Sequence, residues 1–447
     1  MTAWKSMEVS GWGRVPTTRA EVARPERDSQ LRQIVREADG PLLTLGAGRS
    51  YGDVGQPVEG GRGVLATRLD RITAFDADIG RITVEPGVTF ADLHRHLLPR
   101  GWLAPVCPGT AFATIAGALA NDVHGKNQGA AGSFGDHVDA FTLLSAKGES
   151  RSITRTSDPD LFRATIGGLG LTGMITSVSF TLVRVPSNAV LVQEQRIGDL
   201  DSFLAAFEAK KDAHFSVGWI DALSKGRQFG RGLLETAELV SPGLPPAPAK
   251  SRTVPFDLPA VAMSPLSTRM FNAAWWRRVP ADGRSRLVPI PAFLHPLDGL
   301  HQWNRIYGKR GFRQFQCVVP FDDGRATLIR LLEEVARHGH ASFLAVLKAF
   351  GRSGPGMLSF CMPGWTLALD FPERPGVQEL LARLETITRD AGGRIYLAKD
   401  SHLSAEGFAS MYPALGQFRQ VLDRVDPDGR WQSGLARRLR IREGGSS

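Results

Sequence analysis

A glycine-rich segment near the N-terminus constrains the fold of this chain more than any other sequence feature. The run LGAGRSYGD, Leu45–Asp53, continues from Pro41–Leu45, an apolar stretch with the length of a buried strand. Glycines let the backbone turn sharply and aim successive N–H groups at one anion, while Arg49 adds charge and Ser50 a hydroxyl donor. A Rossmann loop would open a long helix, but Pro57 follows closely, and the lysine of a P-loop is absent. The pattern predicts an anion cradle of another type.

Two further glycine-dense segments accompany the first. One runs from Pro108 to Lys126 and contains PGT, TIAG and NDVHGK, and the other is IGGLGLTG, Ile166–Gly173. Any one of them fits a turn-rich domain that binds nothing. Three together predict a long, folded ligand that touches the backbone at many points, because glycine permits close approach.

Strand and helix patterns alternate along the chain, which at 447 residues is too long for one typical core. The pattern of predicted strands and helices changes near Pro186, and the order of elements predicts an α+β fold of two domains. The predicted strands are 41–45, 81–85, 141–145, 176–183, 217–221, 313–320 and 366–371. The predicted helices are 90–98 with Thr89 as N-cap, a start at 114–120, 158–162, 321–338 and 377–391.

The net charge of +9 would suit a protein that binds nucleic acid, but other features of the sequence argue against that function. Basic residues are spread along the chain and interleaved with acids, and no zinc finger, basic zipper or RNP-like motif is present. An anionic cofactor, an anionic substrate and an anionic membrane surface remain as explanations beside general solubility.

Three cysteines, Cys107, Cys317 and Cys361, lie far apart without ligand spacing, so neither a metal site nor a disulfide framework is predicted. The first residues lack the apolar core of a signal peptide, and no apolar run reaches transmembrane length. These features predict a cytoplasmic protein and leave open a peripheral position on the inner membrane.

The region of about 240–300 is unusually basic and aromatic, and we expect it to be a mobile loop region. It contains Trp275-Trp276 followed by Arg277-Arg278. This group suits either a core element or an interfacial patch, because tryptophan and arginine are common at membrane interfaces.

The ordered motifs GRSYGD, PGT, TIAG, NDVHGKN and GGLGLTG resemble the vanillyl-alcohol-oxidase-type FAD-binding family. Gln314–Gln316, Leu397–Ser401 and Met411–Pro413 extend the resemblance over most of the chain. It implies an FAD-binding domain with small mixed sheets (1–184 and 394–447) and a substrate-binding domain with a helix-covered antiparallel sheet (185–393).

The resemblance also implies the cofactor site. FAD would be non-covalent, because Arg49 stands where covalent relatives often carry histidine. The implied FAD-contacting residues are Gly46, Gly48, Arg49, Ser50, Tyr51, Gly109, Thr110, Thr114, Gly117, Asn121, His124, Gly125, Ile175 and Tyr396.

Within the family, the motifs are most similar to members that oxidise the 2′-hydroxyl of a polyprenyl-phosphoryl-β-D-ribofuranose. This would be the first half of an epimerisation to arabinose, completed by a separate NAD(P)H-dependent reductase. The implied substrate contacts are Lys126, Trp219, Gln316, Lys348, Phe350 and Lys399, and the implied catalytic residues are Lys399 and His124.

Several alternatives stay open at this point. Lys399 can act as a base or as an electrostatic stabiliser, and His124 as a base or a packing residue. The rival enzyme is an FAD-dependent sugar-alcohol or aldonolactone oxidase. The alternative that is not an enzyme is a protein that binds anionic lipids or nucleic acid.

Overall fold

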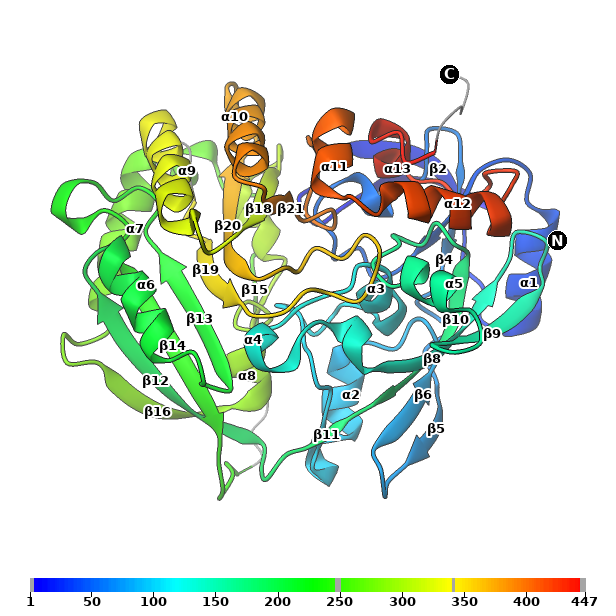
Figure 1. The fold of residues 1–447 in the computed structure, drawn as a ribbon, viewed down its shortest axis with the longest axis horizontal. Coiled ribbons are helices and arrows are strands. Elements are labelled where there is room, and N and C mark those ends of the chain that lie inside the picture. The colour runs from blue at the N-terminus through cyan, green and yellow to red at the C-terminus, as the bar shows by residue number, and fades with distance from the viewer. Residues whose placement is uncertain (1–3, 246–250, 340–341, 443–447) are drawn as a thin grey trace.

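The computed structural model describes residues 4–245, 251–339 and 342–442 and has an α+β fold in two parts. The N-terminal segments and the C-terminal helices form one part, and one large sheet with its covering helices forms the other (Figure 1). The predicted α+β, two-domain fold class is confirmed.

The first sheet carries the glycine-rich segment. Its strand order is β1-β2-β4-β3, and it is mixed, because β1 and β2 are antiparallel whereas β4 is parallel to both β2 and β3. The predicted strand before the glycines is β3, and helix α1 (Asp28–Glu37) packs beside this sheet. The strands are β1 (Lys5–Ser10), β2 (Thr17–Ala23), β3 (Leu42–Leu45) and β4 (Arg62–Leu65).

The second sheet has the order β5-β6-β10-β8-β9 and is antiparallel throughout, not mixed as expected for this domain. A two-stranded ribbon of β7 (Trp102–Leu103) and β11 (Val183–Arg184) lies close to it. The strands are β5 (Ile72–Asp76), β6 (Arg81–Val84), β8 (Val138–Leu144), β9 (Ser150–Thr154) and β10 (Met174–Thr181).

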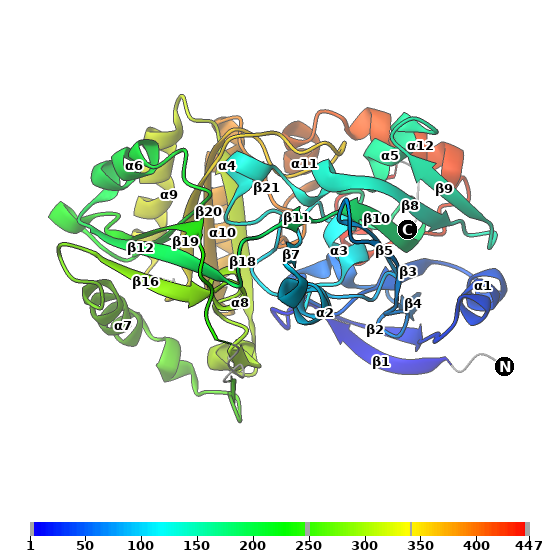
Figure 2. The ribbon, with the colours of Figure 1, turned by 90° about the horizontal axis from the view of Figure 1, so that it is seen from below.

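The large sheet has eight antiparallel strands in the order β16-β12-β14-β13-β19-β20-β18-β21. Three helices cover one face of it: α6 (Leu200–Ala209), α9 (Gly324–His338) and α10 (Val377–Asp390). Helix α7 (Pro265–Arg277) lies on the opposite side (Figure 2). The strands are β12 (Ala189–Ile197), β13 (Phe215–Ile220), β14 (Gly232–Leu239), β16 (Arg284–Pro289), β18 (Phe312–Val319), β19 (Ala345–Phe350), β20 (Gly364–Pro372) and β21 (Arg394–Ile395).

Helix ends follow the capping signals in the sequence. Thr89 forms a capping box with Asp92 at the start of α2, and Asp158 caps α5. The helix expected from Phe321 begins at Gly324, because Phe321 lies in the preceding turn. The helices are α2 (Phe90–His96), α3 (Ile115–Ala120), α4 (Gln128–Ala131), α5 (Pro159–Thr165), α6 (Leu200–Ala209), α9 (Gly324–His338), α10 (Val377–Asp390), α11 (Ala405–Met411), α12 (Leu415–Val425) and α13 (Gly434–Arg438).

The region 240–300 differs from the predicted loop. Its described part contains α7 (Pro265–Arg277), α8 (Ile290–Leu294) and strand β16, which joins the edge of the large sheet beside β12. Ser264 caps α7 and Pro265 occupies its first turn, so ordinary helix signals are present there. Residues 246–250 lie outside the described residues.

The proposed domain boundaries remain a prediction. Strands β11 and β12 lie on either side of the boundary at 184/185, whereas β21 extends the large sheet as far as Ile395. Within the described ranges, no helix has the length and apolar character needed to span a membrane.

Candidate active site

A cavity of about 1290 Å³ lies where the glycine-rich segments face the large sheet. It exceeds the roughly 300–1,000 Å³ of a typical small-molecule pocket, so it has room for a cofactor together with a substrate. Its walls come from all three glycine-dense segments and from β13, β18, β19 and the 396–399 segment.

The backbone of the first glycine segment leaves room for a ligand to approach it closely. Gly48 has φ +64°, a conformation that favours glycine, and it leaves open space where a side chain would stand. A Cβ at Gly46 would lie 2.7 Å from Thr114 Oγ1, so this position also requires glycine. The Thr114 hydroxyl also accepts from Gly117 N at the start of α3, so this threonine caps the helix and touches the first glycine segment at Gly46.

Four buried polar atoms in the cavity wall have no hydrogen-bond partner among the described residues. They are Thr44 Oγ1, Arg49 Nε, Asn121 Oδ1 and, at the rim, Arg278 Nε. Arg49 lies between aromatic rings, 4.4 Å from the centroid of Trp12 and 5.2 Å from that of Phe112, and burial lowers its pKa. Unpaired buried donors and acceptors are costly, so these atoms fit a polar, anionic ligand such as FAD.

Every residue that the sequence assigned to the cofactor lines this cavity. The structure therefore brings together side chains from six separate stretches of chain. They are Gly46, Gly48, Arg49, Ser50, Tyr51, Gly109, Thr110, Thr114, Gly117, Asn121, His124, Gly125, Ile175 and Tyr396.

Three lysines converge on the other end of the cavity. Lys399, Lys348 and Lys126 all line it. Burial lowers the pKa of Lys399 to about 7, with Lys348 lowering it further and Asp370 opposing the shift. Burial likewise lowers the pKa of Lys348 and of Lys126 to about 8 each. Near neutral pH, a substantial fraction of Lys399 is therefore uncharged and able to accept a proton, whereas Lys348 and Lys126 remain mostly charged.

His124 connects this group to the sheet. Its Nδ1 lies 3.2 Å from Lys348 Nζ, and its Nε2 lies 3.0 Å from the Gln316 amide. Burial, followed by the charges of Lys348 and Lys399, holds the pKa of His124 well below its usual value. Lys348 Nζ and Gln316 Nε2 each bring a donor to one ring nitrogen, and the neutral imidazole can accept from only one of them. This environment favours a positioning role for His124 over that of a base.

Five of the six predicted substrate residues line the cavity, and Phe350 does not. Its ring is fully buried and packs edge-on against His124 at 4.7 Å between centroids. Phe350 follows Lys348 by two residues on β19, and its ring packs against His124, so a substrate contact at Phe350 stays a prediction. Trp219 and Gln316 do face the cavity, and Trp219 Nε1 donates to Phe343 O at 2.7 Å.

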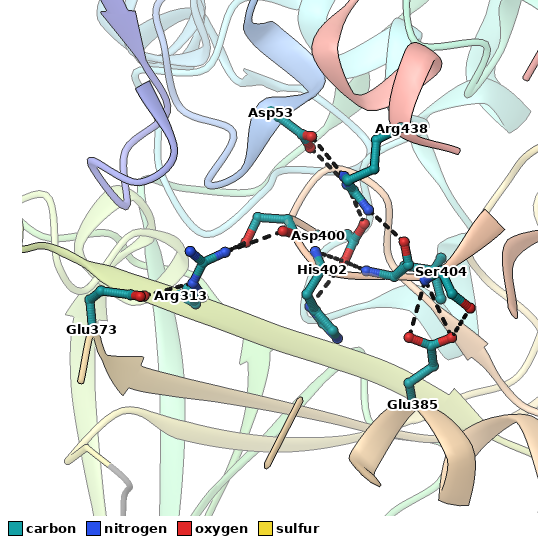
Figure 3. Close-up of polar contacts among 10 residues, drawn as sticks. Asp53, Arg313, Glu373, Glu385, Asp400, His402, Ser404 and Arg438 are labelled. Atoms are coloured by element: carbon teal, nitrogen blue, oxygen red, sulfur yellow. Dashed lines mark hydrogen bonds and ion pairs between the residues drawn. The ribbon is translucent and has the colours of Figure 1, made fainter. Parts of the chain in front are cut away.

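A polar network fixes the segment that carries Lys399 (Figure 3). Arg438 of α13 binds Asp53 at 2.8 Å and Asp400 at 2.7 Å with the same guanidinium group. Arg313 of β18 donates to Ser401 at 3.0 Å while it pairs with Glu373 at 2.6 Å. The end of the glycine cradle and the residue after Lys399 thus share one cation.

Other groups in or beside the cavity were missed from sequence. Asp298 Oδ2 accepts from Ala111 N at 2.6 Å, beside Arg49, and belongs to the 240–300 region that the sequence predicts to be a loop. His94 Nε2 and His295 Nε2 lie 2.9 Å apart next to Cys107, a direct hydrogen-bond distance. Sequence separation hid both groups, since the partners are about 190 or more residues apart.

Comparisons with known proteins agree with this geometry. An FAD binding domain model matches residues 20–154, and a D-arabinono-1,4-lactone oxidase model matches residues 368–439. The decaprenylphosphoryl-beta-D-ribose oxidase of Mycolicibacterium smegmatis is 35% identical over 96% of this chain and 97% of its own. L-gulonolactone oxidase of Mus musculus is 22% identical over 95% of this chain and 96% of its own. The chain therefore belongs to the family of FAD-dependent oxidoreductases that includes decaprenylphosphoryl-beta-D-ribose oxidase.

Proposed function

We propose that this enzyme oxidises the 2′-hydroxyl of a polyprenyl-phosphoryl-β-D-ribofuranose to the 2′-keto sugar. The observation that carries the proposal is the similarity to decaprenylphosphoryl-beta-D-ribose oxidase, which extends over nearly the whole of both chains at 35% identity. The lactone oxidase and dehydrogenase relatives of comparable coverage are 22–24% identical.

The residues around the cavity supply what such an oxidation needs. When bound, FAD accepts the hydride from the carbon that carries the hydroxyl group. Lys399 takes the hydroxyl proton on Nζ as the C=O bond forms, so hydride and proton together account for both hydrogens lost by the alcohol. His124 and Lys348 hold the sugar oxygens in place, and the apolar walls exclude water.

The cavity rim suits a phosphodiester. Arg278 lines the cavity and donates to Glu194 at 2.8 Å and Glu235 at 3.3 Å, while its buried Nε has no partner in the described residues. Arg284 and Arg286 also bind Glu194, and Lys126 lies 3.9 Å from Glu235. Four cations around two carboxylates leave positive charge beside the cavity, which favours a phosphorylated substrate over a neutral lactone.

The outer face of α7 suits a membrane surface. Leu266 and Met270 are 69% and 66% exposed, one turn apart on the helix, and Val261 just before it is 71% exposed. The helix holds no acidic residue, and Arg269 and Arg277 are exposed. Phe271 and Trp275 continue this apolar surface into the cavity rim. A polyprenyl chain can follow that surface, so we assign the protein a peripheral position on the cytoplasmic face of the inner membrane.

A keto sugar is not an end product of an epimerisation. The proposed function therefore includes a partner, an NAD(P)H-dependent reductase that returns hydride to the opposite face of the 2′-carbon. The product stays attached to its lipid, so both enzymes would meet it at the same membrane.

Anaerobic bleaching of the flavin absorbance tests the proposal. We expect farnesyl-phosphoryl-β-D-ribofuranose to bleach the bound flavin in a single turnover, and L-gulono-1,4-lactone and alditols to leave it oxidised. Bleaching by the lactone or an alditol, but not by the phosphoryl ribose, would favour the sugar-alcohol or aldonolactone oxidase alternative. A purified protein without flavin absorbance would contradict both.

A further inference from the structure

A second ionisable group lies behind Lys399 and is not explained by the roles given so far. Asp370 of β20 is fully buried. Its Oδ2 accepts from the Tyr307 hydroxyl at 2.9 Å, and its Oδ1 accepts from Gln314 Nε2 at 2.5 Å. Both donors are neutral, and within the described residues no arginine or lysine pairs with this carboxylate within 4.0 Å. Buried carboxylates are ordinarily paired, so its charge needs another partner.

Gln314 and Tyr51 connect this carboxylate to the cavity. Gln314 lies opposite Asp370 on the neighbouring strand β18, lines the cavity, and hydrogen-bonds the Tyr51 side chain. Lys399 Nζ lies 3.7 Å from the centroid of the Tyr51 ring. Asp370 and Lys399 therefore stand on either side of one tyrosine and one glutamine, in an enclosed part of the site where charges interact strongly.

We propose that Asp370 is the positioning residue that sets the basicity of Lys399, with Gln314 and Tyr307 holding its carboxylate in place. The inference rests on the proposed function only for its catalytic meaning, since the influence of the Asp370 charge on Lys399 is a property of the folded chain.

Several charged and titratable groups surround Asp370 and Lys399, and some of them disfavour the protonated form of Lys399. Lys348 and His124 face Lys399 from β19 and the second glycine segment, and Lys348 opposes its protonation. Tyr51 and Tyr307 face Asp370, and burial raises both phenol pKa values, so both stay protonated. Arg49 and Asp298 influence the pair only through Tyr51. Asp370 is thus the group that favours the charged form of Lys399.

The consequence is that both groups titrate near neutral pH. Burial raises the pKa of Asp370 to about 7, against the hydrogen bonds from Gln314 and Tyr307, and the pKa of Lys399 is also about 7. Without the carboxylate, burial and Lys348 would lower the pKa of Lys399 further. Lys399 would then be neutral over a wider pH range but a weaker base for an alcohol proton.

Competitive labelling of lysine amines across pH 5 to 10, quantified on the Lys399 peptide, measures this directly in flavin-free and flavin-loaded protein. In Asp370→Asn we expect the labelling midpoint of Lys399 to fall by about one pH unit, a roughly tenfold change in proton affinity. The pH at which anaerobic flavin reduction reaches half of its maximal rate should fall as well, and the maximal rate should be about threefold to tenfold lower. Tyr307→Phe should give a smaller shift in the same direction, because the carboxylate loses a donor and ionises less.

Asp122→Asn is the matched control, because Asp122 is also a fully buried acid held by neutral donors, Ser133, Ser359 and Gly135 N. It should leave the Lys399 midpoint unchanged. An unchanged Lys399 midpoint in both Asp370→Asn and Tyr307→Phe would overturn the proposal. If Asp370→Asn does not fold, the midpoint in Tyr307→Phe alone decides the outcome. Labelling needs no substrate, so a shifted midpoint without bleaching by the phosphoryl ribose would contradict the proposed function and leave this inference standing.

Discussion

At the scale of single residues, the site is dominated by amines held where a charge is unfavourable. Lys399, Lys348 and Lys126 share one cavity, and burial is the first cause of the lowered pKa of each. Such positions are common at catalytic centres, because a lysine becomes a base near neutral pH only when its charged form is disfavoured. The proposed role of Lys399 therefore predicts both a loss of chemistry and a change in stability when the amine is removed.

Replacing Lys399 with Met should lower the rate of flavin reduction by at least roughly 100-fold, the usual contribution of a general base. The same variant should melt at a higher temperature. In the unfolded chain the Lys399 amine has its usual pKa near 10.4, whereas in the folded protein its pKa is about 7. Between these two pH values the unfolded state binds more protons than the folded state, so the presence of Lys399 destabilises the fold. The stability gain should therefore grow as pH falls from about 10 to about 7 and stay constant below.

Thermal unfolding at pH 6 and pH 9, with stopped-flow reduction, checks this prediction. Lys210→Met, at an exposed lysine, should change neither measurement. A Lys399→Met variant that reduces its flavin at the normal rate would remove Lys399 from catalysis.

Arg49 predicts how the cofactor is held. Its guanidinium group lies between two aromatic rings in the cradle and is not a nucleophile toward the flavin ring. Denaturation in guanidinium chloride followed by ultrafiltration should release all flavin absorbance into the filtrate. Flavin that stays with the precipitated polypeptide would contradict non-covalent binding.

At the scale of elements, α7 combines two faces with different surroundings. Asn272 and Thr268 are buried, and Asn272 donates to Asp221, whereas Leu266 and Met270 point away from the protein. The helix therefore docks partly through polar contacts and leaves Leu266 and Met270 exposed. This division explains why the sequence alone did not separate a core element from an interfacial patch.

The double change Leu266→Ser and Met270→Ser should weaken binding to vesicles that contain phosphatidylglycerol by at least tenfold, since each buried side chain of this size contributes about 1.5–3 kcal/mol. Vesicle flotation measures it, with flavin content as the test of folding. Ile79→Ser, also at an exposed apolar residue and in a turn with two aspartates, should bind vesicles normally. Equal binding by all three proteins would count against a membrane role for α7.

At the scale of the whole molecule, the C-terminal helix joins cofactor binding to the catalytic segment. Arg438 on α13 holds Asp53, at the end of the first glycine segment, and Asp400, next to Lys399 (Figure 3). These three residues come from opposite ends of the chain. A single cation thus connects the cradle to the base.

Arg438→Met should destabilise the protein by about 3 kcal/mol, the cost of leaving buried carboxylates unpaired, and should weaken FAD binding in the same variant. Saturating FAD should recover part of the lost melting temperature, because a ligand that binds only the folded state stabilises it. Calorimetric titration of flavin-free protein and thermal melts measure both effects. The neighbouring Arg437→Met, at an exposed position on the same helix, should affect neither. Unchanged FAD affinity in Arg438→Met would show that the two segments are independent.

The family resemblance named residues that the structure places around one cavity. The sequence by itself determined the local features: the strand before the glycines, the caps of α2 and α5, and the alternation of elements behind the fold class. These depend on short-range rules of glycine conformation, capping and alternation, which a single segment contains in full. Only the tertiary structure decided that Phe350 packs against His124, that 240–300 contains α7 and β16, and that Asp370, Asp298 and Arg438 belong to the site. Those facts depend on which distant strands and helices pack together, and burial and charge pairing arise only from that packing.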